Sequence, residues 1–250
     1  MTLRFTTTLI LIHLIYAGNC LCAPTGLVEE FPEYEARINW GVGVVKAVGR
    51  AAVPGDIEDP DQARGIAREQ AVIAARRNLS VAVGLVHATS LITVADRVSA
   101  SDVMRMRVEA LVKDAGIISS RQIYDRSYEV IVQTSIWGKG GLSSGLFDNN
   151  AQSADIPAIM IDVQVDGFQP SMFPEVYDSY QRLIASDAPS DNAAAQPIIC
   201  VYYGKARPKT DPNSLPVLYL KLMELTPSGG IILSKQDSAR LRVLLKKHSR

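Results

Sequence analysis

An alanine-rich segment between residues 59 and 86 constrains the fold of this chain more than any other part. It begins at Asp59-Pro60, where a capping aspartate, a proline at the first helical position and Gln62 are typical of a helix start. Small and apolar residues then recur at helical spacing, at Ala63, Ala67, Ala71, Ala74, Asn78, Ala82 and Leu85. The pattern predicts a helix to about Val86 that packs closely on a sheet, because small side chains permit a close approach.

Strands are expected on both sides of this helix. Residues 38–52 form an apolar run interrupted by glycines, which indicates close approach of another backbone. Residues 117–124 and 128–136 alternate around a turn at Asp125-Arg126 and predict a hairpin. Before them, Ser101-Asp102 signals a helical turn, whereas the alternation over residues 106–113 favours a strand. The expected fold class is α+β, with a strand–helix–strand–strand module over residues 38–137.

The N-terminus has the pattern of a secretory leader. Residues 1–22 comprise a short start with one basic residue, an uncharged apolar run and a small-residue end, with cleavage expected after Cys22. The apolar run is shorter than a membrane-spanning helix needs. Cys20 and Cys22 also raise the alternative of a lipidated N-terminus, although neither follows the small residues that lipidation favours. Residues 23–37 are polar and interrupted by proline, and are interpreted as a linker.

A second module is expected after a linker. Residues 138–156 are rich in glycine, serine and asparagine, which is typical of a domain boundary. The rest, residues 157–250, is predicted to be β-rich. Strands are expected at 158–165, 198–203, 217–225 and 231–233, a short hairpin at 175–178 and 182–185, and a final helix at 235–247 capped by Ser234.

The composition offers little catalytic chemistry. The 26 basic residues balance the 26 acidic ones, which argues against a nucleic-acid partner. The three histidines, His13, His87 and His248, lie in no recognisable motif. Cys200 sits in an apolar run and is expected to be a buried thiol. We therefore predict no catalytic, cofactor-binding or metal-ligating residue, and a protein that is not an enzyme.

Two groups of acidic residues are candidates for carboxylate chemistry. Asp56, Glu58, Asp59 and Asp61 are explained by a loop and a helix cap. Asp162 and Asp166 lie four residues apart, which would place them on one face of a strand. Calcium binding or acid–base chemistry there is the alternative to a solvated sheet face.

Several segments resemble one known family. The pattern W-G-x-G-x-x-x-A-x-G at residues 40–49, the alanine-rich helix at 62–79 and the segment 108–136 are similar to the LPP-twenty lipoproteins of Helicobacter and their relatives, the flagellar proteins FlgP and FlgT. Residues 159–162 and the Gly-x-x-Pro-x-Met-x-Pro turn at 167–174 resemble a tail found on some of these proteins. The resemblance implies an exported, non-enzymatic envelope protein, periplasmic or associated with the outer membrane.

Three functions remain open at this point. The first is a structural or assembly role in the cell envelope, in which the sheet edge of the first module binds envelope proteins or a second copy. The second is a binding module for a small periplasmic ligand or an envelope polymer, in a groove between the halves. The third is a hydrolase with an unrecognised carboxylate site. No cofactor is expected.

Overall fold

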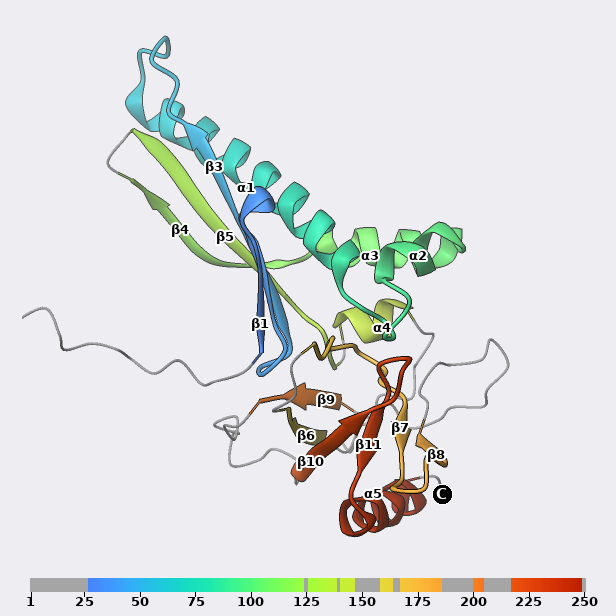
Figure 1. The fold of residues 1–250 in the computed structure, drawn as a ribbon. Coiled ribbons are helices and arrows are strands. Elements are labelled where there is room, and N and C mark those ends of the chain that lie inside the picture. The colour runs from blue at the N-terminus through green and yellow to red at the C-terminus, as the bar shows by residue number, and fades with distance from the viewer. Residues whose placement is uncertain are drawn as a thin grey trace, which may run out of the picture.

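A computed structural model describes residues 27–123, 126–138, 140–146, 158–163, 167–185, 200–204 and 217–248. The described residues form two sheets, one long helix and several shorter helices, which confirms the α+β fold class. The expected leader, residues 1–22, lies outside the described residues. Figure 1 shows the first sheet and its long helix as an arm that projects from the second sheet.

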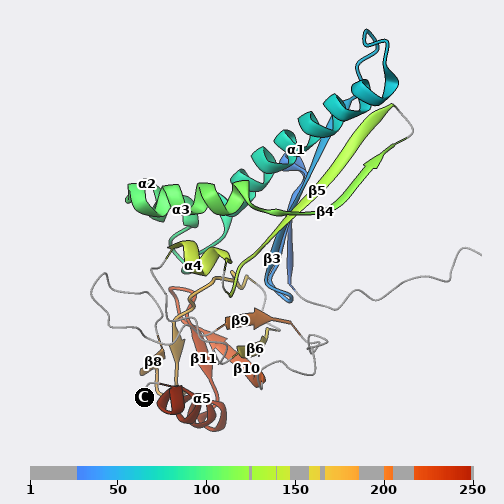
Figure 2. The same cartoon turned by 180° about the vertical axis from the view of Figure 1, so that it is seen from behind.

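The first sheet is antiparallel with the strand order β1-β2-β3-β5-β4. Its strands are β1 (Val28–Phe31), β2 (Ala36–Asn39), β3 (Val44–Ala52), β4 (Gly116–Gln122) and β5 (Ser127–Ser135). The long helix α1 (Pro60–Leu85) lies along one face of this sheet, over β3 and β5 (Figures 1 and 2). The hairpin of β4 and β5 confirms the prediction, and a bulge falls between Ile117 and Ser119.

The close contact between α1 and the sheet depends on small residues. The buried positions of the helix are Ala63, Ala67, Ala71, Ala75, Leu79, Ala82 and Val83. They follow steps of four residues for most of the helix, so the contact line winds around it to match the twisted sheet. Three of the positions predicted on this stripe, Ala74, Asn78 and Leu85, are therefore only half-buried.

Asp59 caps α1 as predicted, accepting a hydrogen bond from the Asp61 amide at 2.9 Å. Further along the helix, the Asn78 side-chain amide donates to the Val48 carbonyl of β3 at 2.8 Å. This hydrogen bond fixes the position of α1 along the direction of β3, in addition to holding the helix on the sheet.

Two predictions for the N-terminal part of the arm are wrong. The single strand expected over residues 38–52 is broken by a turn at residues 40–43, where the Asn39 side chain accepts hydrogen bonds from the amides of Gly41 and Val42. Gly43 has a φ of 65°, which favours glycine. In addition, the segment expected to be a linker contains β1, a 3-10 turn (Pro32–Tyr34) and the first two residues of β2.

The strand predicted at residues 106–113 is a helix. After the short helix α2 (Val94–Ser99), helix α3 runs over Asp102–Lys113. The capping signal was correct, because the Ser101 hydroxyl accepts a hydrogen bond from the Met104 amide at 3.4 Å. Its buried side chains, Val108 and Val112, lie four residues apart, which is the spacing of a helix face.

The second sheet has the strand order β8-β7-β11-β10-β6-β9 and mixes parallel with antiparallel pairs. Its strands are β6 (Ala158–Asp162), β7 (Val176–Tyr177), β8 (Leu183–Ala185), β9 (Cys200–Tyr203), β10 (Val217–Leu225) and β11 (Ile231–Leu233). The helix α5 (Lys235–His248) packs on β10 and β11. The predicted hairpin, the strands at 217–225 and 231–233 and the Ser234 cap of the last helix are confirmed.

The two halves share one hydrophobic core. The amides of Met172 and Phe173 donate to the carbonyls of His87 and Ala88, each at 2.8 Å, just beyond the end of α1. The Trp137 ring meets the Phe173 ring edge to face, with centroids 5.8 Å apart. The docking therefore combines backbone hydrogen bonds with aromatic packing.

The predicted linker at residues 138–156 is not uniformly a linker. Helix α4 (Leu142–Leu146) lies within it, and both Leu142 and Leu146 are buried in the shared core. Helix α4 packs against α3 of the first half. Residues 147–156 lie outside the described residues.

Candidate functional site

The outer edge of the first sheet is the most accessible backbone feature of the arm. Strand β4 ends the sheet order, and no other described strand pairs with its outer side. Six of its seven residues are exposed, including two large apolar side chains, Ile117 at 41% and Ile118 at 50%. Unpaired amides and carbonyls along such an edge are a template for a further strand. Figure 2 shows β4 on the side of the arm, clear of the second sheet.

A buried carboxylate holds β4 in place. Glu129 on β5 lies between Arg121 of β4 and Arg50 of β3, its direct neighbours across the strands. Arg121 donates to one carboxylate oxygen at 3.0 and 2.8 Å, and Arg50 donates to the other at the same two distances. Arg50 also bonds Glu35. The network crosses three strands on the face opposite α1.

The charge of this network is balanced. Only 5% of Glu129 is exposed, because the two arginines cover it. Hydrogen bonds from Arg121, and after them those from Arg50, hold the pKa of the Glu129 carboxyl below its ordinary value, against the effect of burial. Glu129 therefore stays ionised at neutral pH. Arg121, the one ionisable residue of β4, is paired within its own sheet.

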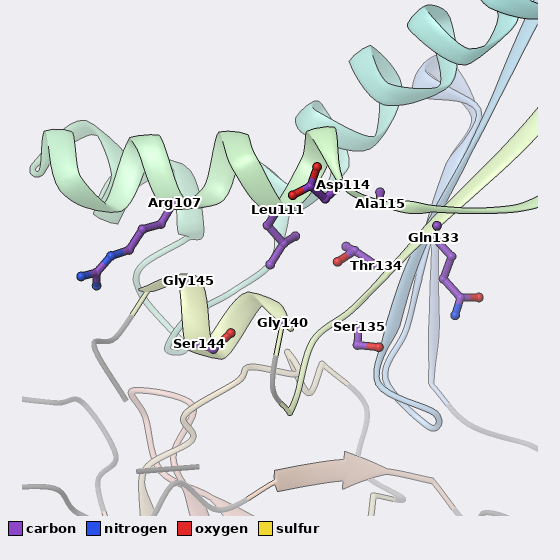
Figure 3. Close-up of a pocket in the computed structure, with 11 residues that line it drawn as sticks. Arg107, Leu111, Asp114, Ala115, Gln133, Thr134, Ser135, Gly140, Ser144 and Gly145 are labelled. Carbon is purple, nitrogen blue, oxygen red and sulfur yellow. The ribbon is translucent and has the colours of Figure 1, made fainter. Parts of the chain in front are cut away.

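A polar pocket lies near the base of the arm (Figure 3). It has a volume of about 390 Å³ and is enclosed by the end of α3, the start of β4, the end of β5 and α4. Arg107 of α3 and Asp114, the residue directly after α3, line one side of the pocket. Gln133, Ser135 and Ser144 line the other sides. These groups can donate and accept hydrogen bonds, which suits a small polar ligand. The pocket lies between elements of residues 107–145 and not between the two sheets.

A second polar cluster joins β1 to the second half. The Glu29 carboxylate accepts hydrogen bonds from the Trp40 indole at 2.8 Å and from the Gln169 side-chain amide at 3.2 Å. Burial raises the pKa of Glu29, while these hydrogen bonds and the nearby His87 act in the opposite direction. Because Gln169 belongs to the second half, Glu29 is a polar link across the docked surfaces.

His87 lies two residues beyond the end of α1. Its side chain is half-buried, and its Nδ1 atom has no hydrogen-bond partner in the part of the chain that the structure describes. The main-chain carbonyl of His87 accepts the hydrogen bond from the Met172 amide of the second half.

The acidic residues considered from the sequence do not form a described site. Asp59 and Asp61 serve the start of α1, and Asp162 ends β6, whereas Asp166 lies outside the described residues. Among the residues that the structure covers, no group of three or more histidine, cysteine or acidic side chains is arranged to hold a metal ion. The side chains of Cys200 and His248 also lie outside the description.

Sequence reasoning did not identify the residues of the pocket or the Glu129 network. The pocket is lined by residues from three segments within 107–145, at 107–116, 133–135 and 140–145, and no periodic pattern in the sequence shows that they enclose a common space. For the network, alternation in β5 places Glu129 opposite α1, but only the strand register shows that two arginines flank it. In the described residues no helix is both long and apolar enough to cross a membrane.

No protein-family model matches the chain, and no curated protein matches it.

Proposed function

We propose that this protein is a non-enzymatic, exported component of the cell envelope that takes part in assembly through the edge of its first sheet. The observation that carries the proposal is strand β4, an exposed sheet edge with two accessible isoleucines. The one charged side chain of this strand, Arg121, is already paired with Glu129. An added strand would gain main-chain hydrogen bonds along β4, and the isoleucines would lose contact with water.

The shape of the arm supports this role. Helix α1 has 26 residues, which corresponds to a rod of about 39 Å. The arm extends β4 away from the second half (Figure 1). A partner can therefore approach the edge without meeting the second sheet. The Glu129 network supports the same role, because it keeps β4 ordered before a partner binds.

The location in the envelope is supported by the leader pattern of residues 1–22 and by the resemblance to LPP-twenty and FlgP/FlgT-like proteins. Fractionation of native cells with an intact-mass measurement tests it. A mature chain that starts at Ala23 in the periplasm, or an acylated start at Cys20 or Cys22 in the outer membrane, would support export. A full-length chain in the cytoplasm would refute it.

The assembly role is tested by photo-crosslinking in native cells. A photoreactive amino acid replaces Ile118 in one chain and Val243 of α5 in another, a matched apolar position that is 71% exposed. We expect a discrete adduct of defined mass from position 118 and none from position 243. Equal labelling at the two positions, or none at 118, would refute the role of the β4 edge.

A second function is favoured by the 390 Å³ pocket. We propose, as the alternative, binding of a small polar ligand there. Thermal-shift measurements with zwitterionic amino acids and neutral disaccharides test it, with Gln133→Leu as the variant that removes a hydrogen-bonding wall. A shift seen with the unaltered chain and lost in the variant supports binding. No shift with either class argues against it.

A further inference from the structure

We propose that the pocket at the base of the arm binds a short peptide in an extended conformation, whose main chain pairs with the edge of β5 at Ser135. This inference rests on the second function proposed above, the binding of a small polar ligand in the 390 Å³ pocket, and names the class of ligand. Three features of the pocket carry it: the point where β4 stops covering β5, a buried hydroxyl beside that point, and the apolar residues of the walls.

Strand β5 extends beyond the part that β4 covers. The pairing of the two strands begins with Gly116 opposite Gln133, whereas β5 continues to Ser135. If that register continued, Asp114 would lie opposite Ser135. Asp114 instead caps the end of α3, and its amide donates to the Ala110 carbonyl. The β5 edge is therefore open where α3 ends, and residues on both sides of this opening line the pocket.

The main-chain groups of Ser135 point into this opening. In an antiparallel sheet, successive residues direct their N–H and C=O groups toward alternate neighbouring strands. Ile136 donates its amide to Gly43 on the β3 side, so the N–H and C=O of Ser135 point to the other side, which β4 does not reach. Neither group has a backbone partner among the residues that the structure describes. Ser135 is exposed, so one residue of an extended peptide can accept from its N–H and donate to its C=O.

A buried hydroxyl lies beside the open edge. Thr134 lines the pocket and is only 6% exposed. Its hydroxyl makes no hydrogen bond within the part of the chain that the structure describes. Figure 3 shows the Thr134 side chain directed from β5 toward Leu111 of α3, into the pocket. A hydroxyl this buried is normally hydrogen-bonded, and a main-chain group of the bound peptide would be its partner.

The apolar residues of the walls suit the side chains of a peptide. Leu111 of α3 and Ala115, just after this helix, line the pocket next to the start of β4. Side chains alternate between the two faces of a strand. The ligand residues on either side of the one paired with Ser135 would therefore direct their side chains to the face of Thr134, toward these walls. The volume of about 390 Å³ is near the lower end for ligand pockets, which limits the bound segment to a few residues.

Two substitutions of Ser135 separate its main chain from its side chain. Ser135→Pro removes the N–H, which takes no part in the pairing with β3, so the sheet is retained. Ser135→Ala removes the hydroxyl and keeps the N–H. The probe is a blocked trialanine peptide, acetylated at one end and N-methylamidated at the other, titrated into the isotope-labelled full chain and followed by amide chemical shifts. We expect equal binding to the unaltered chain and Ser135→Ala, and about tenfold weaker binding to Ser135→Pro. Equal affinity for all three chains overturns the main-chain pairing.

A second pair of probes needs only the unaltered chain. The same peptide with every amide N-methylated has no N–H to donate to the Ser135 carbonyl, and we expect it not to bind. Equal binding of the two peptides overturns the inference.

Maltose, a neutral disaccharide, separates this inference from the proposed ligand binding. Shifts of the Thr134 and Ser135 amides with maltose, and none with the peptide, overturn the peptide class and leave the binding of a small polar ligand in place. No shift with maltose, the peptide or a free amino acid overturns both.

Discussion

Replacement of Gly49 by alanine tests how closely α1 lies on the sheet. Gly49 is on β3, directly beneath the helix. A Cβ atom at this position would lie 2.1 Å from the Ala75 amide nitrogen and 2.3 Å from the Ala71 carbonyl oxygen. Both atoms belong to the helix backbone, so no side-chain rotation relieves the clash. The helix would have to move away by about 1 Å to reach ordinary contact distances of 3.4 Å.

The expected cost is large for one methyl group. Overpacking typically costs 1–3 kcal/mol, and we expect about 3 kcal/mol here because the displaced group is a 26-residue helix. Moving the helix also stretches the hydrogen bond from Asn78 to Val48. For a chain of this size, about 3 kcal/mol corresponds to a fall of about 6–12 °C in the unfolding midpoint.

Gly65→Ala is the matched control. Gly65 lies on the exposed side of the same helix, and a Cβ there would meet nothing within 4 Å. Because alanine favours the helix over glycine by about 1 kcal/mol, this variant should be more stable than the parent chain. Thermal and urea unfolding followed by far-UV circular dichroism measure both. A Gly49→Ala variant as stable as the parent chain would show that α1 does not lie this close to β3.

Three further substitutions test the polar contacts. Glu129→Gln should lower the free energy of unfolding in urea by about 1.5–3 kcal/mol, because it weakens charge-assisted hydrogen bonds to two arginines that can still reach water. The pKa of Glu129 is lower in the folded state, so the contribution of its charge to stability is lost as the pH falls below the ordinary value of 4.5. The stability of the variant should therefore fall less steeply with acidification than that of the parent chain. Glu29→Gln should have the opposite pH effect. Because the pKa of Glu29 is raised in the folded state, the parent chain gains stability as the pH falls from neutral toward 4.5. The side-chain oxygen of the variant can still accept both hydrogen bonds, so the variant should have a higher melting temperature at about pH 7.5 and a flatter dependence of stability on pH. Asp59→Ala should cost about 1 kcal/mol in urea unfolding through loss of the α1 cap, and an unchanged midpoint would contradict that assignment.

The sequence predicted best those features that depend on neighbouring residues. The caps at Asp59, Ser101 and Ser234 each satisfy amides within one turn, so the residues themselves contain the information. The same reasoning failed at residues 106–113, because eight residues of apparent alternation do not separate a strand from a short helix with two buried valines.

Features that depend on distant partners were not predictable. Strands β1 and β2 are short and lie on either side of the turn that begins at Pro32. They form because β2 pairs with the edge of β3, and β1 then pairs with β2. Gly49 was recognisable as a point of close approach, but its contact with Ala71 and Ala75 needs the register of helix on strand. The pocket and the Glu129 network likewise depend on which strands become neighbours, and hydrophobic periodicity does not specify that order.

The place where α1 ends has a mechanical consequence. The backbone just after the helix, at His87 and Ala88, is bonded to Met172 and Phe173 of the second half. A rigid helix that is fixed to the sheet along its length and anchored at its end acts as a lever. Tension or torque applied to β4 by a bound partner would be transmitted through the helix to the second sheet, instead of being absorbed by a flexible joint.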